Sequence, residues 1–185
     1  TTTLGAVAAK KLAAHPDFAA VTVEMLTQAG VCAGDVVALN MSGSFPALNI
    51  AAIAAVDAMG AQPVIISSAG ASTWGANRPE YTWLNMEQQL VAAGVWTWRS
   101  QAAGRGGGSD MGRGLAPEGI ELLDQALKRS GVPALQSTSV DDAIKKRLAI
   151  YRQKNNGKLP RALINVGGSH VIFGEHGHDA FLKQG

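Results

Sequence analysis

Four segments rich in serine and glycine carry the side chains of this sequence that are best suited to chemistry. They cover residues 42–46, 67–77, 104–114 and 167–170. Glycine lets the backbone approach a ligand closely and adopt positive φ, and the free N–H groups at the start of a helix attract anions. The composition of these loops therefore predicts a site for an anion or a carboxylate.

Three arginines and one tryptophan lie in or beside these loops. Arg78 ends the second loop, whereas Arg105 and Arg113 flank the glycines of the third. Arginine holds a carboxylate with two parallel hydrogen bonds, so these side chains favour a polyanionic or carboxylate ligand. Trp74 stands among small residues, and we expect it at the site. The expected ligand-binding residues are Ser42, Gly43, Ser68, Gly70, Ser72, Trp74, Asn77, Arg78, Arg105, Gly107, Gly108, Ser109, Arg113 and Gly168.

Ser44 stands between an apolar segment and a predicted helix, which is where a nucleophile elbow places its serine. Asp110 and His170 follow in the order Ser, Asp, His that α/β-hydrolases use. The local sequence departs from G-x-S-x-G, and Pro46 removes a donor from the expected oxyanion hole. Two interpretations stay open: a serine nucleophile served by Asp110 and His170, or a serine that caps a helix.

The end of the chain contains residue types that bind zinc, namely His176, His178 and Asp179. Histidines do not cluster elsewhere, so this metal site is the weaker alternative, and we expect no metal or other cofactor. None of the loops is a Walker or dinucleotide fingerprint.

Composition limits the classes of protein to which the chain can belong. Its 185 residues suit one domain, and 46% hydrophobic with 16% charged residues is a globular composition. The net charge of +2 and the scarcity of aromatic residues argue against a nucleic-acid partner. One cysteine allows no internal disulfide, and no apolar run reaches the 18 residues of a transmembrane helix.

The loops must be positioned by alternating strands and helices. Val36–Leu39 and Pro63–Ser67 are short apolar runs typical of strands buried on both faces, and an alanine-rich helix over 47–59 joins them. This is one βαβ unit. Further helices are predicted over 82–93, from Pro117 to Gly131, and over 140–155 with Ser139 as its cap. Further strands are predicted at Val95–Trp98, Ala134–Leu135 and Ala162–Val166.

This alternation predicts a three-layer, Rossmann-like α/β domain with a parallel sheet over residues 1–185. Residues 3–29, broken near Pro16 with Asp17 as a helix cap, form a helical N-terminal segment that we expect to pack on it. The alternative is a smaller α+β unit with residues 1–30 apart. Too little chain follows Val166 for another crossover, so we expect a fragment whose sheet is incomplete. Another segment or chain would then cover the edge of the last strand.

Four motifs together resemble the poly-gamma-glutamate system protein family. They are Ser42–Ile50, Ser67–Asn77, Thr82–Glu87 and Gly107–Gly112, and the resemblance runs from about residue 34 to 170. It implies a soluble, extracytoplasmic domain of a membrane-anchored protein, encoded with the machinery that makes and exports poly-gamma-glutamate. It supplies no established active site.

Three functional hypotheses follow from these observations. The first is an accessory domain that binds the anionic polymer, its gamma-glutamyl carboxylates, or the membrane synthase and exporter subunits. The second is a serine hydrolase or transferase acting on gamma-glutamyl amide bonds. The third is a structural partner domain whose loops are buried in an interface.

Overall fold

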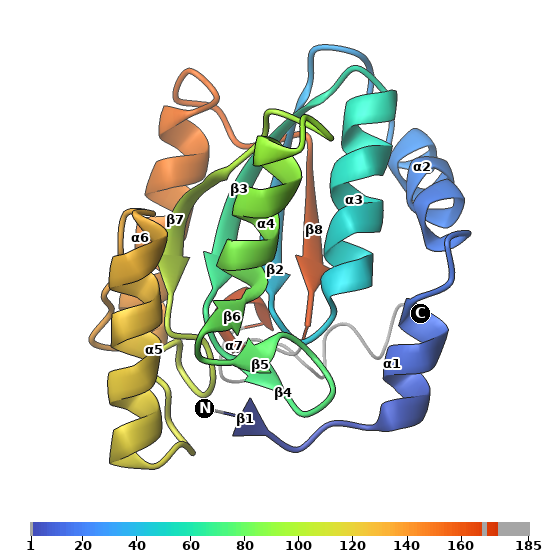
Figure 1. Cartoon of the computed structure of the whole chain (residues 1–185). Coiled ribbons are helices and arrows are strands. Elements are labelled where there is room, and N and C mark those ends of the chain that lie inside the picture. Colours follow the sequence, from blue (N-terminus) through green and yellow to red (C-terminus); the bar gives the residue numbers. More distant parts are fainter. Residues whose placement is uncertain (1, 168–169, 174–185) are drawn as a thin grey trace.

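The computed structural model describes residues 2–167 and 170–173 and contains the expected α/β fold (Figure 1). Four parallel strands form the central sheet in the order β7-β3-β2-β8. Their bounds are β2 (Val36–Ser42), β3 (Gln62–Ser68), β7 (Ser100–Gly104) and β8 (Ala162–Val166). The carboxyl ends of these strands all lie at one edge of the sheet, because the strands are parallel.

Alternate side chains of β2 pack on opposite faces of the sheet, as the two-residue period of a strand requires. Val37 and Leu39 belong to a core cluster that also contains Ile53 of α3 (Pro46–Ala58) and Trp83 of α4 (Trp83–Ala92). Ala38 faces the other way, toward Tyr151 of α6 (Val140–Gln153). Figure 1 shows α3 and α4 in front of the sheet. The result is the three-layer, Rossmann-like arrangement.

The remaining helices complete the layers. Leu123 and Leu127 of α5 (Pro117–Ser130) pack with Ala103 of β7. Leu26 of α2 (Phe18–Gln28) joins the same core cluster as α3, so the N-terminal segment shares the core of the domain. The short helices are α1 (Val7–Ala13) and α7 (His170–Phe173). None of the helices in the described ranges is long and apolar enough to cross a bilayer.

Several helix boundaries match the sequence prediction for the expected reasons. Pro46 and Pro117 lie in the first turns of α3 and α5. Gly131 ends α5 at φ 67°, the left-handed conformation that glycine adopts without strain. The Ser139 side chain accepts a hydrogen bond from the Asp142 N–H and caps α6. Asp17 precedes α2, but its side chain makes no cap hydrogen bond.

Two predicted elements are wrong, and the predicted strand Ala134–Leu135 is reduced to a single parallel bridge between Ala134 and Ala103. Residues 95–98 form no strand, and the third strand of the sheet is Ser100–Gly104, whose small residues carry little hydrophobic signal. The N-terminal helix does not begin at Thr3. Instead β1 (Thr2–Thr3) pairs in parallel with β4 (Ala71–Ser72), a contact between segments about 70 residues apart. A local pattern cannot reveal such a contact.

Two further short strands lie in the loop after β3, β5 (Asn77–Arg78) and β6 (Tyr81–Thr82), and they pair antiparallel. At the other end of the sheet, β8 pairs with β2, and no other described strand covers its outer edge. Leu163 of β8 is half exposed. The expectation that another segment or chain covers this edge stays a prediction.

A buried chain of polar side chains crosses the carboxyl edge of the sheet. Asp110, in the glycine-rich loop after β7, accepts hydrogen bonds from the Gly106 N–H at 3.1 Å and from Arg147 of α6 at 2.8 Å. Arg147 also donates to Asn40 of β2 at 3.3 Å, and the Asn40 amide donates to Asn165 of β8 at 2.7 Å. Asn40 and Asn165 are register partners. The chain therefore fixes a loop, a helix and two strands relative to one another.

A second buried acid joins α4 to β7. Glu87 is 2% exposed and accepts hydrogen bonds from the N–H and the hydroxyl of Ser100, at 2.9 and 2.8 Å. The Ser100 hydroxyl lies 2.7 Å from that of Ser67. Burial raises the pKa of Glu87, and the bonds from Ser100 oppose that rise. These contacts explain how a strand with so few large apolar residues is held in the sheet.

The Arg147–Asp110 ion pair gives the first testable prediction. Both side chains are at most 2% exposed, so removing one partner leaves an uncompensated buried charge, at a cost of about 3–5 kcal/mol. Arg147→Met and Asp110→Asn should each destabilise the fold, and the double variant should lose less than the sum. Urea unfolding of the four proteins measures the coupling, which we expect at about 1–3 kcal/mol.

The half-exposed Arg105–Asp124 pair is the matched control for that cycle. Its coupling should be about 0.2–1 kcal/mol, as for other solvent-screened pairs. Equal coupling in the two cycles would mean that the buried chain does not fix the fold as described.

The second prediction concerns Glu87. Its folded-state pKa lies above the unfolded value of about 4.3. Between these two pKa values the native state binds more protons than the unfolded state. The stability of the native state therefore falls as the pH rises from about 4.3 through the raised pKa. Glu87→Gln, which keeps the shape of the side chain, should remove this fall.

Urea unfolding between pH 4 and 8 tests the effect. The Gln variant should gain stability relative to the wild type as the pH rises and then reach a plateau. Glu121→Gln, on the exposed surface of α5, controls for the loss of one negative charge. Parallel stability curves for the wild type and Glu87→Gln would contradict this account.

Candidate functional site

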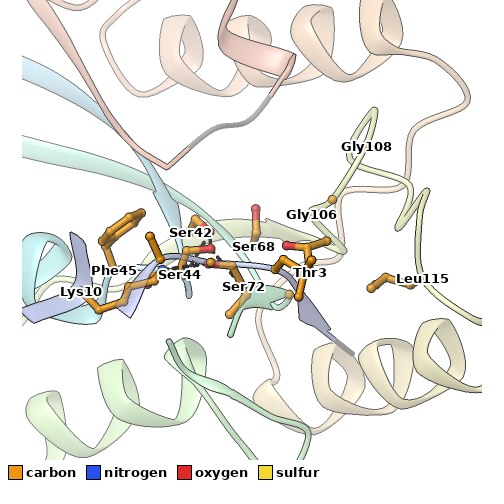
Figure 2. A pocket seen from close by; sticks show the side chains of 16 residues that line it. Thr3, Lys10, Ser42, Ser44, Phe45, Ser68, Ser72, Gly106, Gly108 and Leu115 are labelled. Atoms are coloured by element: carbon orange, nitrogen blue, oxygen red, sulfur yellow. Dashed lines mark hydrogen bonds between the residues drawn. The ribbon is translucent and has the colours of Figure 1, made fainter. Parts of the chain in front are cut away.

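The first three serine- and glycine-rich loops meet at one cleft, at the carboxyl ends of β2 and β3 (Figure 2). The cleft has a volume of about 390 Å³ and is open to solvent. The lining residues come from the loops after β2, β3 and β7 and from the N-terminal segment. They are Thr3, Leu4, Gly5, Ala6, Lys10, Ser42, Ser44, Phe45, Ser68, Gly70, Ala71, Ser72, Gly106, Gly107, Gly108 and Leu115.

Three serines on one side of the cleft are joined by hydrogen bonds. The Ser42 hydroxyl donates to the Ser44 hydroxyl at 2.9 Å and accepts from the Ser44 N–H at 3.1 Å. The Ser44 hydroxyl also accepts the Ser72 N–H at 3.0 Å. The loop after β2 is thereby tied to the loop after β3, and the Ser72 hydroxyl itself remains part of the cleft lining (Figure 2).

Lys10 of α1 is the basic side chain that enters this cleft. Its ammonium group donates to the Ser72 hydroxyl at 2.7 Å and to the Ser44 carbonyl, and it lies 3.6 Å from the centre of the Phe45 ring. Burial lowers the pKa of Lys10. No local sequence pattern marks Lys10, because this residue lies more than 30 positions from every loop that it contacts.

The pairing of β1 with β4 brings Lys10 to the serines. Thr2 and Thr3 lie in register with Ala71 and Ser72, and the Thr73 N–H donates to the Thr3 carbonyl at 2.7 Å. Further along the chain, the Gly5 N–H donates to the Thr73 hydroxyl at 2.7 Å. The chain then turns into α1, which carries Lys10 over the ends of β2 and β3.

Gly75 shows how closely two of the loops approach each other. A Cβ at this position would lie 2.6 Å from the Gly43 carbonyl oxygen and 2.8 Å from the Ser44 Cα, so only glycine fits. The preceding Trp74 adopts φ 68°, which is unusual for a large side chain. The Ser72–Gly75 turn is therefore shaped to hold the serine loops together.

The glycine-rich loop forms the opposite side of the cleft. Gly106 and Gly107 adopt φ values of 76° and 71°, and both line the cleft with Gly108. Ser109 is buried behind them at φ 58°, so it shapes the loop and does not line the cleft. The Asp110 carboxylate holds this loop through the Gly106 N–H. Burial raises the pKa of Asp110, and the Arg147 guanidinium opposes that rise.

The arginines and the tryptophan of the sequence prediction lie elsewhere. Arg78 forms an exposed ion pair with Glu80, and Arg105 binds Asp124 with two bonds of 2.6 Å. Arg113 is exposed and, like the other two arginines, does not line the cleft. Trp74 is 69% exposed. Asn77 lies in β5, also outside the lining. The cation of the described site is therefore Lys10.

The proposed Ser44, Asp110 and His170 set is only partly described. Ser44 lines the cleft, whereas the Asp110 carboxylate is bound by Arg147 and by the Gly106 N–H. The backbone of His170 begins α7, but its side chain lies outside the described residues.

The remaining predicted positions also lie outside the described residues. These are Gly168 and the alternative metal ligands His176, His178 and Asp179. In the part of the chain that the structure describes, no three metal-binding side chains come together.

Comparison with known proteins gives no match to any protein-family model, any curated protein or any solved structure.

Proposed function

We propose that this chain is an accessory domain of a poly-gamma-glutamate synthesis or export system, and that its cleft binds gamma-glutamyl carboxylates. One observation carries the binding proposal: the Lys10 ammonium group lies inside a cleft lined by serine hydroxyls and glycine backbone. A charged donor and neutral hydroxyls are the groups that bind a carboxylate through charge-assisted hydrogen bonds.

The shape of the cleft supports this ligand class. The glycines at 106–108 leave the loop backbone exposed to the cleft without side chains that would block it. Phe45 and Leu115 add apolar surface, against which the methylene groups of a glutamyl unit can pack. The resemblance to the poly-gamma-glutamate system family supplies the polymer, the synthase and exporter partners, and the extracytoplasmic, membrane-anchored setting of this proposal.

The open cleft also favours ligand binding over a purely structural role. A structural partner domain would bury these loops in an interface, and its loop side chains would not need to surround a cavity. Here three loops and the N-terminal segment enclose about 390 Å³ around one cation. That enclosure is typical of a small-molecule or polymer-end site.

Calorimetric titration with gamma-glutamyl oligomers at low salt tests the proposal. We expect saturable binding that Lys10→Met weakens about 10- to 100-fold, because a hydrogen bond to a charged group contributes about 1.5–3 kcal/mol. Lys10→Arg keeps the charge and should retain most of the affinity. Polyaspartate tests whether the spacing of the carboxylates matters.

Lys11→Met is the matched control, because Lys11 is the next residue of α1 and its side chain is exposed. It removes the same charge from the same helix without touching the cleft. Equal weakening by the two variants would indicate nonspecific attraction, and absence of binding to both polymers would refute the binding proposal.

A further inference from the structure

We propose that Ser72 is a nucleophile and Lys10 its general base, and that the cleft performs acyl transfer on a carbonyl substrate. The gamma-glutamyl amide as substrate class rests on the proposed function above, in which the ammonium form of Lys10 binds. Acyl transfer uses the neutral form of the same side chain, and the Ser72–Lys10 pair stands on its own geometry. This set differs from the Ser44, Asp110 and His170 hypothesis in both nucleophile and base.

The first support is the direct contact between the two groups. The Lys10 Nζ and the Ser72 Oγ are 2.7 Å apart, within the 2.6–3.2 Å that a nucleophile and its base require. Serine paired with lysine is a known variant of the catalytic triad. When Lys10 is a neutral amine, the direction of this hydrogen bond reverses, and the Ser72 hydroxyl donates the hydrogen bond to Nζ.

The second support is the way in which both groups are held. The Ser44 carbonyl and the Phe45 ring fix the end of the Lys10 side chain. The Ser44 hydroxyl accepts the Ser72 N–H, and Ser42 orients that hydroxyl in turn. Ser42 and Ser44 are thus positioning residues, and Ser72 remains at the cleft surface, where a substrate can reach it.

The third support is the local environment of the base. The described polar contacts of Lys10 include no carboxylate, whereas the Ser44 carbonyl and the face of the Phe45 ring favour its ammonium form. Burial lowers its pKa, so the amine form becomes available at lower pH than on the protein surface. The Ser72 hydroxyl thereby contacts a base whose neutral form is more accessible than that of a fully solvated lysine.

The reaction follows from these positions. The Ser72 Oγ attacks the carbonyl carbon as its proton passes to the Lys10 Nζ, and the tetrahedral adduct then breaks its C–N bond. Lys10 returns the proton to the leaving amine, which yields an acyl ester on Ser72. Water, or an acceptor amine in a transferase, then attacks the carbonyl carbon of this ester. Lys10 takes a proton from the attacking water or amine and passes it to the Ser72 oxygen as the ester C–O bond breaks. The net change is hydrolysis or transfer of one amide bond.

A fluorophosphonate probe tests the nucleophile without any polymer. Intact mass spectrometry and peptide mapping should show one label, on Ser72, and Ser72→Ala should abolish it. Lys10→Arg keeps a positive charge but supplies no neutral base, so labelling should slow by about 10²–10⁴-fold, the contribution of a general base. Labelling of the wild type should rise with pH through the titration of Lys10.

Lys11→Arg is the control and should label like the wild type. Circular dichroism of each variant establishes that it is folded. A folded wild type that resists labelling up to pH 10, a label on Ser44, or equal labelling of Ser72→Ala would overturn the assignment.

The two proposals fail in distinguishable ways. Polymer binding without probe labelling would leave an accessory binding domain and refute the nucleophile. Labelling without polymer binding would support the nucleophile and overturn the gamma-glutamyl substrate. If the protein both binds the polymer and is labelled by the probe, the wild type should shorten gamma-glutamyl oligomers or exchange their ends. Ser72→Ala should cause neither change.

Discussion

The buried ion pair between Arg147 and Asp110 is the interaction on which the arrangement of the sheet edge depends. Two opposite charges removed from water are tolerated only when their remaining hydrogen bonds are made. Here the Gly106 N–H binds Asp110 and the Asn40 side chain binds Arg147, while Asn40 binds Asn165 across the β2–β8 pair. Because each member needs the next, the loop after β7 and the ends of β2 and β8 keep one relative position.

These contacts give Asp110 a structural role, whereas the order Ser, Asp, His in the sequence indicated a catalytic one. The sequence Ser, Asp, His suggested an acid that orients a catalytic base. In the structure, the Asp110 carboxylate holds the Gly106–Gly108 backbone against the cleft and compensates the charge of a buried arginine. An acid in a glycine-rich loop can thus serve a site through the shape of the loop.

The parts of the fold that sequence reasoning predicted well have strong local signals. The apolar runs of β2, β3 and β8, the prolines at the starts of α3 and α5, and the Ser139 cap all act within a few residues. The strand β7 was missed because its small side chains give a weak apolar signal, and the buried Glu87 of α4 that helps to hold it is distant in sequence.

The site was predicted in the same uneven way. The serines and glycines at the strand ends were found from their types and positions. Lys10 was missed because only the β1–β4 pairing brings α1 to that edge of the sheet. The arginines near the loops were expected at the site, but Arg78 and Arg105 form ion pairs with neighbouring acids.

The position of Lys10 in the cleft depends on the pairing of β1 with β4. Two residue pairs of strand and a few hydrogen bonds hold the first residues of the chain, whereas the sheet beneath has two long strands paired over seven residues. Segments with few buried contacts open at a lower free energy than the core. If this segment detached, Lys10 would leave the cleft, whereas Ser42 and Ser44 would stay at the end of β2. A ligand that contacts Lys10 would therefore stabilise the docked position of β1 and α1, and the docked segment would in turn stabilise the bound ligand.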